Sequence, residues 1–382
     1  MRFPSGVLWL VLLTSACAQA PHRAEPITVL ADDLFAHVAA PTPPEDIFAL
    51  SDPMRAYLHG ALAERVRRYG ATQGLVQALR DDLRIEYDTA GTRTAAEAFD
   101  ARAGNCLSLV ILTAALAREL DLPVRFQAVY GHDTWARTGD LAFLSGHVNL
   151  LLGRPQLGRI QHDRQEPALI VDFLPSADLQ NLHASVIDES TLVAMYYNNR
   201  AAEHLADGDR DAAYAWARAA VLAAPTFTPA YNTLGVIYRR QGALNEARRA
   251  LAVALDQEPE NQRALSNMVE VLAGLGRADD AEAYRQRLKA IEPYAPFYFL
   301  DQGLAALQRG ELREATQLFR RELTRMPYNH ELHFALAATE YRLGDIRSAK
   351  RHMTLAMEHS STRDRRELYA AKLERLTHGS VY

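Results

Sequence analysis

The segment with the clearest chemical potential is Arg102-Ala-Gly-Asn-Cys-Leu-Ser108, which places Cys106 at the start of an apolar run. Asn105 is a favoured N-cap residue, and residues 107–120 predict a largely buried helix. A thiol in the first turn of a helix lies near unpaired amide groups and the positive end of the helix dipole, and both favour the thiolate. Cys106 is therefore a candidate nucleophile, although a free cysteine is more often a small core residue.

Two residues further along the chain could serve such a nucleophile as base and orienting group. His147 stands near the start of a predicted strand over residues 146–152, and Asp172 interrupts an apolar strand over residues 168–174. A carboxylate inside an apolar strand is costly unless it is paired. If the two strands are neighbours, His147 can accept the Cys106 proton while Asp172 holds the imidazole tautomer.

Other chemistries find little support in this sequence. Cys17 and Cys106 are the only cysteines, so no disulfide framework is predicted. His132, His162 and His183 lack ligand-like spacing, and we predict neither a metal site nor a cofactor. There is no phosphate loop, dinucleotide fingerprint or Gly-x-Ser-x-Gly motif. With 42 basic and 47 acidic side chains, the net charge of −5 gives no indication of nucleic-acid binding.

The first 17 residues read as an export signal. A short basic start precedes the apolar run 7–13 and a group of small residues, too short to span a bilayer stably. The end of this segment, Thr14-Ser-Ala-Cys17, resembles a bacterial lipobox, in which the cysteine is lipidated, although Thr14 replaces the usual Leu or Val. The alternative is plain secretion with cleavage after Ala20. We expect a lipoprotein anchored through Cys17 and facing the periplasm, with the outer membrane favoured by the resemblance.

The chain of 382 residues is too long for one compact core, so at least two domains are expected. Residues 18–50 include Pro41-Thr-Pro-Pro44 and predict a stiff linker. Residues 51–190 predict helices first and then strands, the strand at 124–130 being followed by a loop over 131–145. This order indicates an α+β domain with an antiparallel sheet.

From about residue 194 the sequence repeats every 34 residues. Proline, glycine and alanine keep this interval at Pro225, Pro259, Pro293 and Pro327, at Gly208, Gly242, Gly276, Gly310 and Gly344, and at Ala213, Ala247, Ala281, Ala315 and Ala349. The period and pattern resemble tetratricopeptide repeats, in which each unit is a pair of antiparallel helices. Five such units over 194–361 predict an all-α solenoid, and residues 362–382 contain a polar capping helix and tail.

The motif Arg102-x-Gly-Asn-Cys106, followed by a strand with His147 and a strand with Asp172, resembles the transglutaminase-like superfamily over roughly residues 50–185. The resemblance implies a papain-like fold in which Cys106 is the nucleophile, His147 the general base and acid, and Asp172 the orienting group. It also implies an oxyanion hole formed by the backbone N–H of Cys106 and a donor upstream, for which Tyr87 is the candidate. Val148 and Phe173 stand where such domains often carry an aromatic residue and a proline.

Two functions follow as hypotheses. One is a cell-envelope cysteine enzyme that attacks carboxamide or peptide bonds through a thioester, with the repeat array binding a protein or peptide partner. Five apolar residues are expected on the concave side of the array, where they receive either the C-terminal helix or a partner peptide: Phe297, Leu300, Leu304, Leu307 and Phe334. The alternative is a non-catalytic scaffold lipoprotein with a remnant transglutaminase-like domain.

Overall fold

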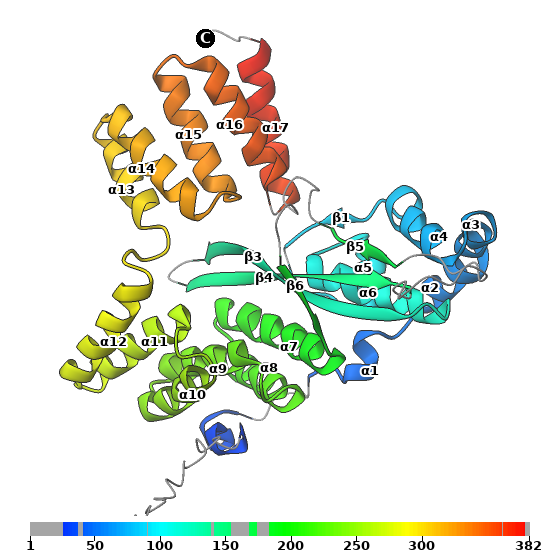
Figure 1. Cartoon of the computed structure of the whole chain (residues 1–382), viewed down its shortest axis with the longest axis horizontal. Coiled ribbons are helices and arrows are strands. Elements are labelled where there is room, and N and C mark those ends of the chain that lie inside the picture. The colour runs from blue at the N-terminus through cyan, green and yellow to red at the C-terminus, as the bar shows by residue number, and fades with distance from the viewer. Residues whose placement is uncertain are drawn as a thin grey trace, which may run out of the picture.

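The computed structural model describes residues 26–36, 41–89, 91–138, 141–153, 168–173, 183–360 and 362–378. An α+β domain precedes a helical array, as predicted (Figure 1). The segment predicted to be an export signal, including Cys17, lies outside the described residues. Within the described part of the chain, no helix has the length and apolarity needed to cross a membrane.

The α+β domain begins with helices that surround one almost completely buried helix. That central helix is α6 (Cys106–Glu119), in which every residue from Cys106 to Ala117 is buried. A reciprocal capping box between Thr94 and Glu97 begins the helix before it, α5. The other helices are α1 (Pro44–Ile47), α2 (Asp52–Tyr57), α3 (Ala63–Tyr69), α4 (Ala71–Gln77) and α5 (Ala95–Ala101), with π-helical turns at Leu58–Leu62 and Ala78–Asp82.

The sheet that follows is antiparallel, in the order β5-β4-β3-β6. Its strands are β3 (Val124–Thr138), β4 (Leu141–Leu152), β5 (Leu169–Val171) and β6 (His183–Ile187). A separate pair, β1 (Glu86–Tyr87) and β2 (Ala103–Gly104), runs parallel.

The predicted loop over residues 131–145 is wrong. β3 and β4 continue through it as one long hairpin, with a register shift between Val129 and Thr134. Backbone groups in such a hairpin are paired by the partner strand, so the ribbon does not need the apolar alternation that marks a half-buried strand. β6 was not predicted; it pairs with β3, and its residues 183–186 are exposed, so no core pattern marks it.

The array consists of helix pairs, and a glycine turn joins the two helices of each pair. Gly208, Gly242, Gly276, Gly310 and Gly344 all have a φ between 72° and 85°, a conformation that favours glycine. The five alanines at the same period are at most 2 % exposed. The helices are α7 (Glu189–Ala206), α8 (Arg210–Ala223), α9 (Thr228–Gln241), α10 (Leu244–Gln257), α11 (Gln262–Gly274), α12 (Ala278–Ile291), α13 (Tyr298–Gln308), α14 (Leu312–Arg325), α15 (His330–Arg342), α16 (Ile346–Glu358) and the final α17 (Arg363–His378).

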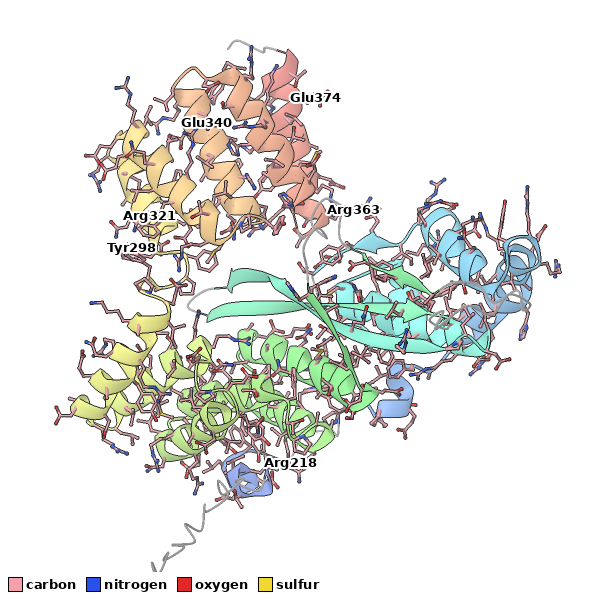
Figure 2. The ribbon with its side chains drawn as sticks, viewed as in Figure 1. Arg218, Tyr298, Arg321, Glu340, Arg363 and Glu374 are labelled. Carbon is pink, nitrogen blue, oxygen red and sulfur yellow. The ribbon has the colours of Figure 1, made fainter. Side chains whose placement is uncertain are left out.

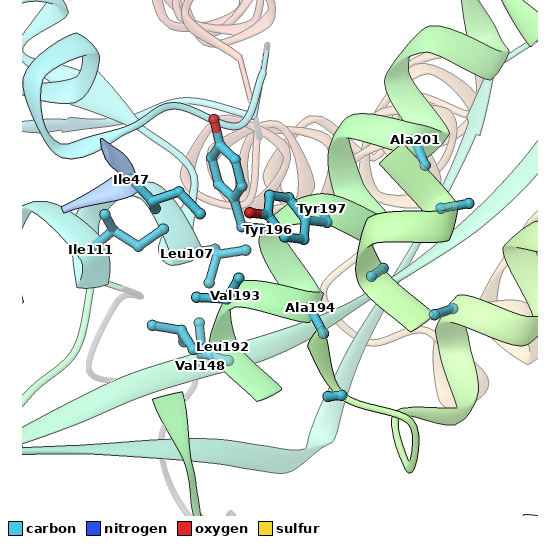
Figure 3. Packing of buried hydrophobic residues seen from close by; sticks show 14 of the residues in the cluster. Ile47, Leu107, Ile111, Val148, Leu192, Val193, Ala194, Tyr196, Tyr197 and Ala201 are labelled. Carbon is cyan, nitrogen blue, oxygen red and sulfur yellow. The ribbon is translucent and has the colours of Figure 1, made fainter. Parts of the chain in front are cut away.

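Helix α7 belongs to the core of the α+β domain as well as to the first repeat. Figure 3 shows its Leu192 and Val193 beside Leu107 of α6 and Val148 of β4. One buried cluster runs from the α+β domain to α12. The first repeats and the α+β domain therefore share a single hydrophobic core.

Part of the predicted linker is packed onto the repeats instead. The backbone N–H of Ala31 donates to the hydroxyls of Tyr214 and Tyr238 at 3.1 and 2.9 Å. Phe35 stacks on Tyr214 with ring centroids 4.0 Å apart, and Asp32 pairs with Arg218 at 2.9 Å. Figure 2 labels Arg218 beside this N-terminal segment. Composition alone suggested a spacer, because the tyrosines that satisfy its backbone lie 183 and 207 residues further along the chain.

Helices α13–α17, here called the second lobe, have buried clusters of their own, distinct from the cluster that ends at Ala281 of α12. In the view of Figure 1, the β3–β4 hairpin is drawn between this lobe and helices α7–α12. At the junction, Phe297 has a φ of 64°, an uncommon conformation for a residue other than glycine. The array is thus a solenoid whose core is interrupted between its third and fourth repeats.

A group of buried imidazoles lies in the second lobe. His333 and His352 stack with centroids 5.3 Å apart, their Nδ1 atoms are 3.1 Å apart, and Nε2 of His333 faces the carbonyl of Pro327 at 3.0 Å. Burial lowers the pKa of His333 and of His352 to about 4, helped for His352 by the charges of Arg351 and Arg320. Burial and the charge of Arg365 also lower the pKa of His330 to about 4. All three are neutral in the folded lobe at neutral pH.

We predict that acid destabilises the second lobe first. Between pH 6.5 and about 4, the unfolded chain binds protons on these histidines that the folded lobe does not, so stability falls as the pH falls through this window. Burial raises the pKa of Glu340, so its protonation in acid favours the folded lobe, but this is one group against three histidines. Hydrogen-exchange protection of α15 and α16, measured at neutral pH and at about pH 5, should fall more than that of α9 and α10. An equal loss in both regions contradicts the prediction.

Candidate active site

The loop before α6 has a conformation that its residue types explain. Arg102 ends α5 in the left-handed region with a φ of 50°. A Cβ on Gly104 would lie 2.7 Å from Cβ of Ser108, so only glycine fits there. Asn105 then caps α6, its Oδ1 accepting the backbone N–H of Ser108 at 2.9 Å. Cys106 is consequently the first residue of the helix.

The structure brings the three predicted site residues together. Nε2 of His147 lies 2.9 Å from both carboxylate oxygens of Asp172. Antiparallel pairing of β4 with β5 creates this contact, because Asp172 directly follows the last residue of β5. The thiol of Cys106 acts on the same imidazole and contributes to raising its pKa. Since Nε2 faces Asp172, Nδ1 is the ring nitrogen left to face the sulfur.

This setting determines the charge of His147. Burial alone would lower its pKa, but hydrogen bonds to Asp172 and Cys106, together with their negative charges, outweigh burial and raise the pKa to about 9. At neutral pH the ring is therefore an imidazolium. It can donate Nε2–H to the carboxylate and Nδ1–H toward the sulfur.

One supporting residue was missed from the sequence. Nδ2 of Asn149 donates to Oδ2 of Asp172 at 2.9 Å, and Asn149 is only 6 % exposed. It gives the carboxylate a second donor besides His147. The sequence could have indicated Asn149, because residues two apart on a strand share a face. Asn149 is two residues after His147 in an otherwise apolar strand.

Tyr87 also lies at the site. Its strand β1 pairs with β2 so that Tyr87 is opposite Gly104, two residues before Cys106. Burial, followed by the negative charges of Cys106 and Asp172, raises the pKa of Tyr87, so its hydroxyl keeps its proton and remains a donor. The backbone carbonyl of Tyr87 accepts a hydrogen bond from Arg366 of α17 at 3.4 Å.

The site is almost closed to solvent. Cys106 is 6 % exposed, and the side chains of His147 and Asp172 are 4 % and 5 % exposed. Low local polarity strengthens the hydrogen bonds among them. Burial also leaves only a small part of Cys106 accessible to solvent.

Of the other residues considered in the sequence, some lie in the described part of the chain and some outside it. His183 is exposed, whereas the side chains of His132 and His162, like Cys17, are outside the described residues. Among the side chains that are described, no group of three or more His, Cys, Asp or Glu is arranged to hold a metal ion.

The predicted apolar groove is present in the second lobe, with one correction. A hollow of about 350 Å³ is lined by Leu300, Leu304, Leu307 and Phe334, and α17 forms a further wall through Leu368 and Tyr369. Phe334 stacks on Tyr369 with centroids 5.2 Å apart. Phe297 does not line the hollow. It is the N-cap residue of α13, is 2 % exposed and belongs to a buried cluster of the second lobe.

We predict that Asp172→Asn lowers the pKa of His147 from about 9 toward its ordinary 6.5. The substitution removes the negative charge while an amide oxygen can still accept one hydrogen bond. NMR titration of the imidazole resonances, assigned with His147→Gln, measures this directly. The control is Asp209→Asn at the N-cap of α8, where asparagine caps equally well. A His147 titration that is the same in both variants contradicts the electrostatic account.

Comparison with known proteins identifies two kinds of domain in the chain. Residues 60–172 match the model of the transglutaminase-like superfamily, and residues 238–294 match a tetratricopeptide repeat. A search of curated proteins finds no match. Among solved structures, the chain is similar to the pilF protein of Pseudomonas aeruginosa, with 19 % identity, 50 % of this chain and 96 % of that chain covered, and a TM-score of 0.28.

Two further structures are similar at the same level. PilW, a type IV pilus biogenesis factor, has 21 % identity, covers 49 % of this chain and 87 % of its own, and has a TM-score of 0.27. A thermophilic tetratricopeptide protein of Thermus thermophilus has 20 % identity, covers 47 % and 99 %, and has a TM-score of 0.28. By the family models, the chain carries a transglutaminase-like domain, which contains Cys106, His147 and Asp172, followed by tetratricopeptide repeats.

Proposed function

We propose that this protein is a cysteine enzyme that attacks a carboxamide or peptide bond of a protein or peptide substrate. The observation that supports it is the buried His147–Asp172 pair, whose imidazole has a pKa raised in part by the nearby Cys106 thiol. A nucleophile next to a base that is held by an orienting group is the arrangement that activates a thiol for acyl transfer; here these are Cys106, His147 and Asp172.

In the acylation step, the sulfur of Cys106 attacks the carbonyl carbon of the substrate. The imidazolium of His147 stabilises the thiolate before attack and then gives its Nδ1 proton to the departing nitrogen. The carbon–nitrogen bond breaks, an amine leaves, and a thioester remains on Cys106. Oxyanion donors would be the backbone N–H of Cys106, which has no helical partner in the first turn, and the hydroxyl of Tyr87.

In the second step, the now neutral His147 accepts a proton from the incoming nucleophile. Water forms a carbon–oxygen bond and releases an acid, whereas an amine forms a new amide. In both cases the carbon–sulfur bond breaks and the sulfur leaves as the thiolate, beside the imidazolium of His147. Which nucleophile wins depends on how well water is excluded from the thioester. The low exposure of Cys106 favours an amine that is bound in the site.

The repeats are the interaction module of this enzyme. Tetratricopeptide arrays bind protein segments, and the hollow bounded by α13, α15 and α17 offers an apolar surface for a partner or substrate peptide. We further propose that the protein is exported and lipid-anchored at Cys17, in the cell envelope and facing the periplasm. The lipobox-like sequence before Cys17 supports this part.

The alternative is a scaffold in which the transglutaminase-like domain has no turnover. The near-closed site favours this alternative, since Cys106 is 6 % exposed. The two hypotheses differ in the chemical behaviour of one sulfur atom, which can be measured without knowing the substrate.

An activated acyl ester, p-nitrophenyl acetate, tests the proposal. We predict that the ester acetylates Cys106 in the wild type, as seen by peptide mass spectrometry, and that His147→Gln slows this by roughly a hundredfold or more. Added methylamine should divert the thioester from acetate to N-methylacetamide. Asp209→Asn serves as the control for general effects of substitution.

Labelling of Cys106 at the same rate in the wild type and in His147→Gln supports the scaffold instead. In that case Cys106→Ala should also leave partner capture by the repeats unchanged.

A further inference from the structure

A hydrogen bond joins the first repeat to the loop that precedes the nucleophile helix. The backbone N–H of Thr92 donates to Oε1 of Glu203 at 2.8 Å, across 111 residues of sequence. Glu203 is on α7, and Thr92 is 3 % exposed. A buried backbone N–H needs an acceptor, and a carboxylate is a strong one.

The path continues from Thr92 to the cap of α6. Nδ2 of Asn105 donates to Oγ1 of Thr92 at 2.9 Å. Oδ1 of the same asparagine accepts both the backbone N–H and the hydroxyl of Ser108 at 2.9 Å. The hydroxyl oxygen of Ser108 in turn accepts the backbone N–H of Arg93 at 2.8 Å. Glu203 therefore fixes the segment that orients the residue immediately before Cys106.

Glu203 is itself held in place on the repeat side. Nη1 of Arg200, one helical turn earlier, pairs with Oε2 of Glu203 at 2.6 Å, leaving Oε1 for Thr92. The guanidinium of Arg200 also lies over the ring of Trp216 on α8, 5.5 Å from its centroid. Both carboxylate oxygens have defined partners, so the acceptor that Thr92 meets has a fixed position.

We propose that Glu203 is a positioning residue for Cys106, so that the tetratricopeptide array completes the active site of the transglutaminase-like domain. Without this acceptor, Thr92 and then Asn105 shift, and the sulfur moves relative to His147. A displacement of about 1 Å at a reacting atom can cost on the order of a hundredfold in rate. The inference rests on the proposed cysteine chemistry, but its geometric part can be measured separately.

Three variants make the test. Glu203→Met removes the acceptor at similar size, and Glu203→Gln keeps an acceptor oxygen while removing the charge. Glu246→Met is the matched control, because Glu246 also pairs with an arginine three residues away on a repeat helix, at similar side-chain exposure. It differs in its position on α10, a helix that packs between α9 and α11.

The first readout is acylation of Cys106 by p-nitrophenyl acetate. Glu203→Met should be slower by roughly ten- to a hundredfold, Glu203→Gln should recover most of the rate, and Glu246→Met should match the wild type. Equal rates in Glu203→Met and Glu246→Met overturn the inference. Circular dichroism and the thermal midpoint establish that each variant is folded.

The second readout is the NMR titration of His147, which does not require turnover. The Cys106 sulfur, as acceptor and by its charge, helps to raise the pKa of His147 to about 9, so a displaced sulfur should lower that pKa in Glu203→Met but not in Glu203→Gln. If the pKa of His147 is lowered in Glu203→Met but neither the wild type nor any variant is acylated, the positioning role is supported and the proposed enzymatic function is rejected. An unchanged pKa in Glu203→Met, when the wild type acylates normally, rejects the positioning role alone.

Discussion

The cap of α6 by Asn105 is the constraint on which the rest of the site depends. It ends the connection from α5, begins the helix at Cys106, and fixes the sulfur at the end where helical amides are unpaired. Gly104 is needed because Ser108 leaves no room for a side chain, and Ser108 is needed because it returns to the cap. Each of these residues is selected by its neighbour's geometry.

The charges of the site are acceptable only as a group. A buried imidazolium or carboxylate alone would be costly, but His147 and Asp172 neutralise each other and Asn149 supplies a further donor to the carboxylate. The same low exposure that makes these bonds strong restricts access to Cys106. The burial of the site therefore both strengthens the hydrogen bonds that could activate Cys106 and limits access to it.

The repeats and the α+β domain form one folded body in their first part. Helix α7 contributes to the common core, segment 26–36 packs against the tyrosines of α8 and α9, and Glu203 reaches the nucleophile loop. The second lobe differs, since its buried clusters are separate and burial lowers the pKa of its His333. The chain thus combines a core shared by the α+β domain and the first repeats with a second lobe that has clusters of its own and contacts Tyr87 through Arg366.

A single sequence is sufficient for features that have a local or periodic origin. The glycine turns, the 34-residue pairs and the capped cysteine helix could be predicted because caps and repeats act over a few residues, whereas His147 and Asp172 were predicted from the strand pattern and the family resemblance. The long hairpin, strand β6 and the packing of segment 26–36 were not, because their backbone partners are distant in the chain. The roles of Asn149 and Glu203 became apparent in the fold. The strand pattern places Asn149 on the same face as His147, but its hydrogen bond to Asp172 and that of Glu203 to Thr92 span 23 and 111 residues, and folding is what brings each donor to its acceptor.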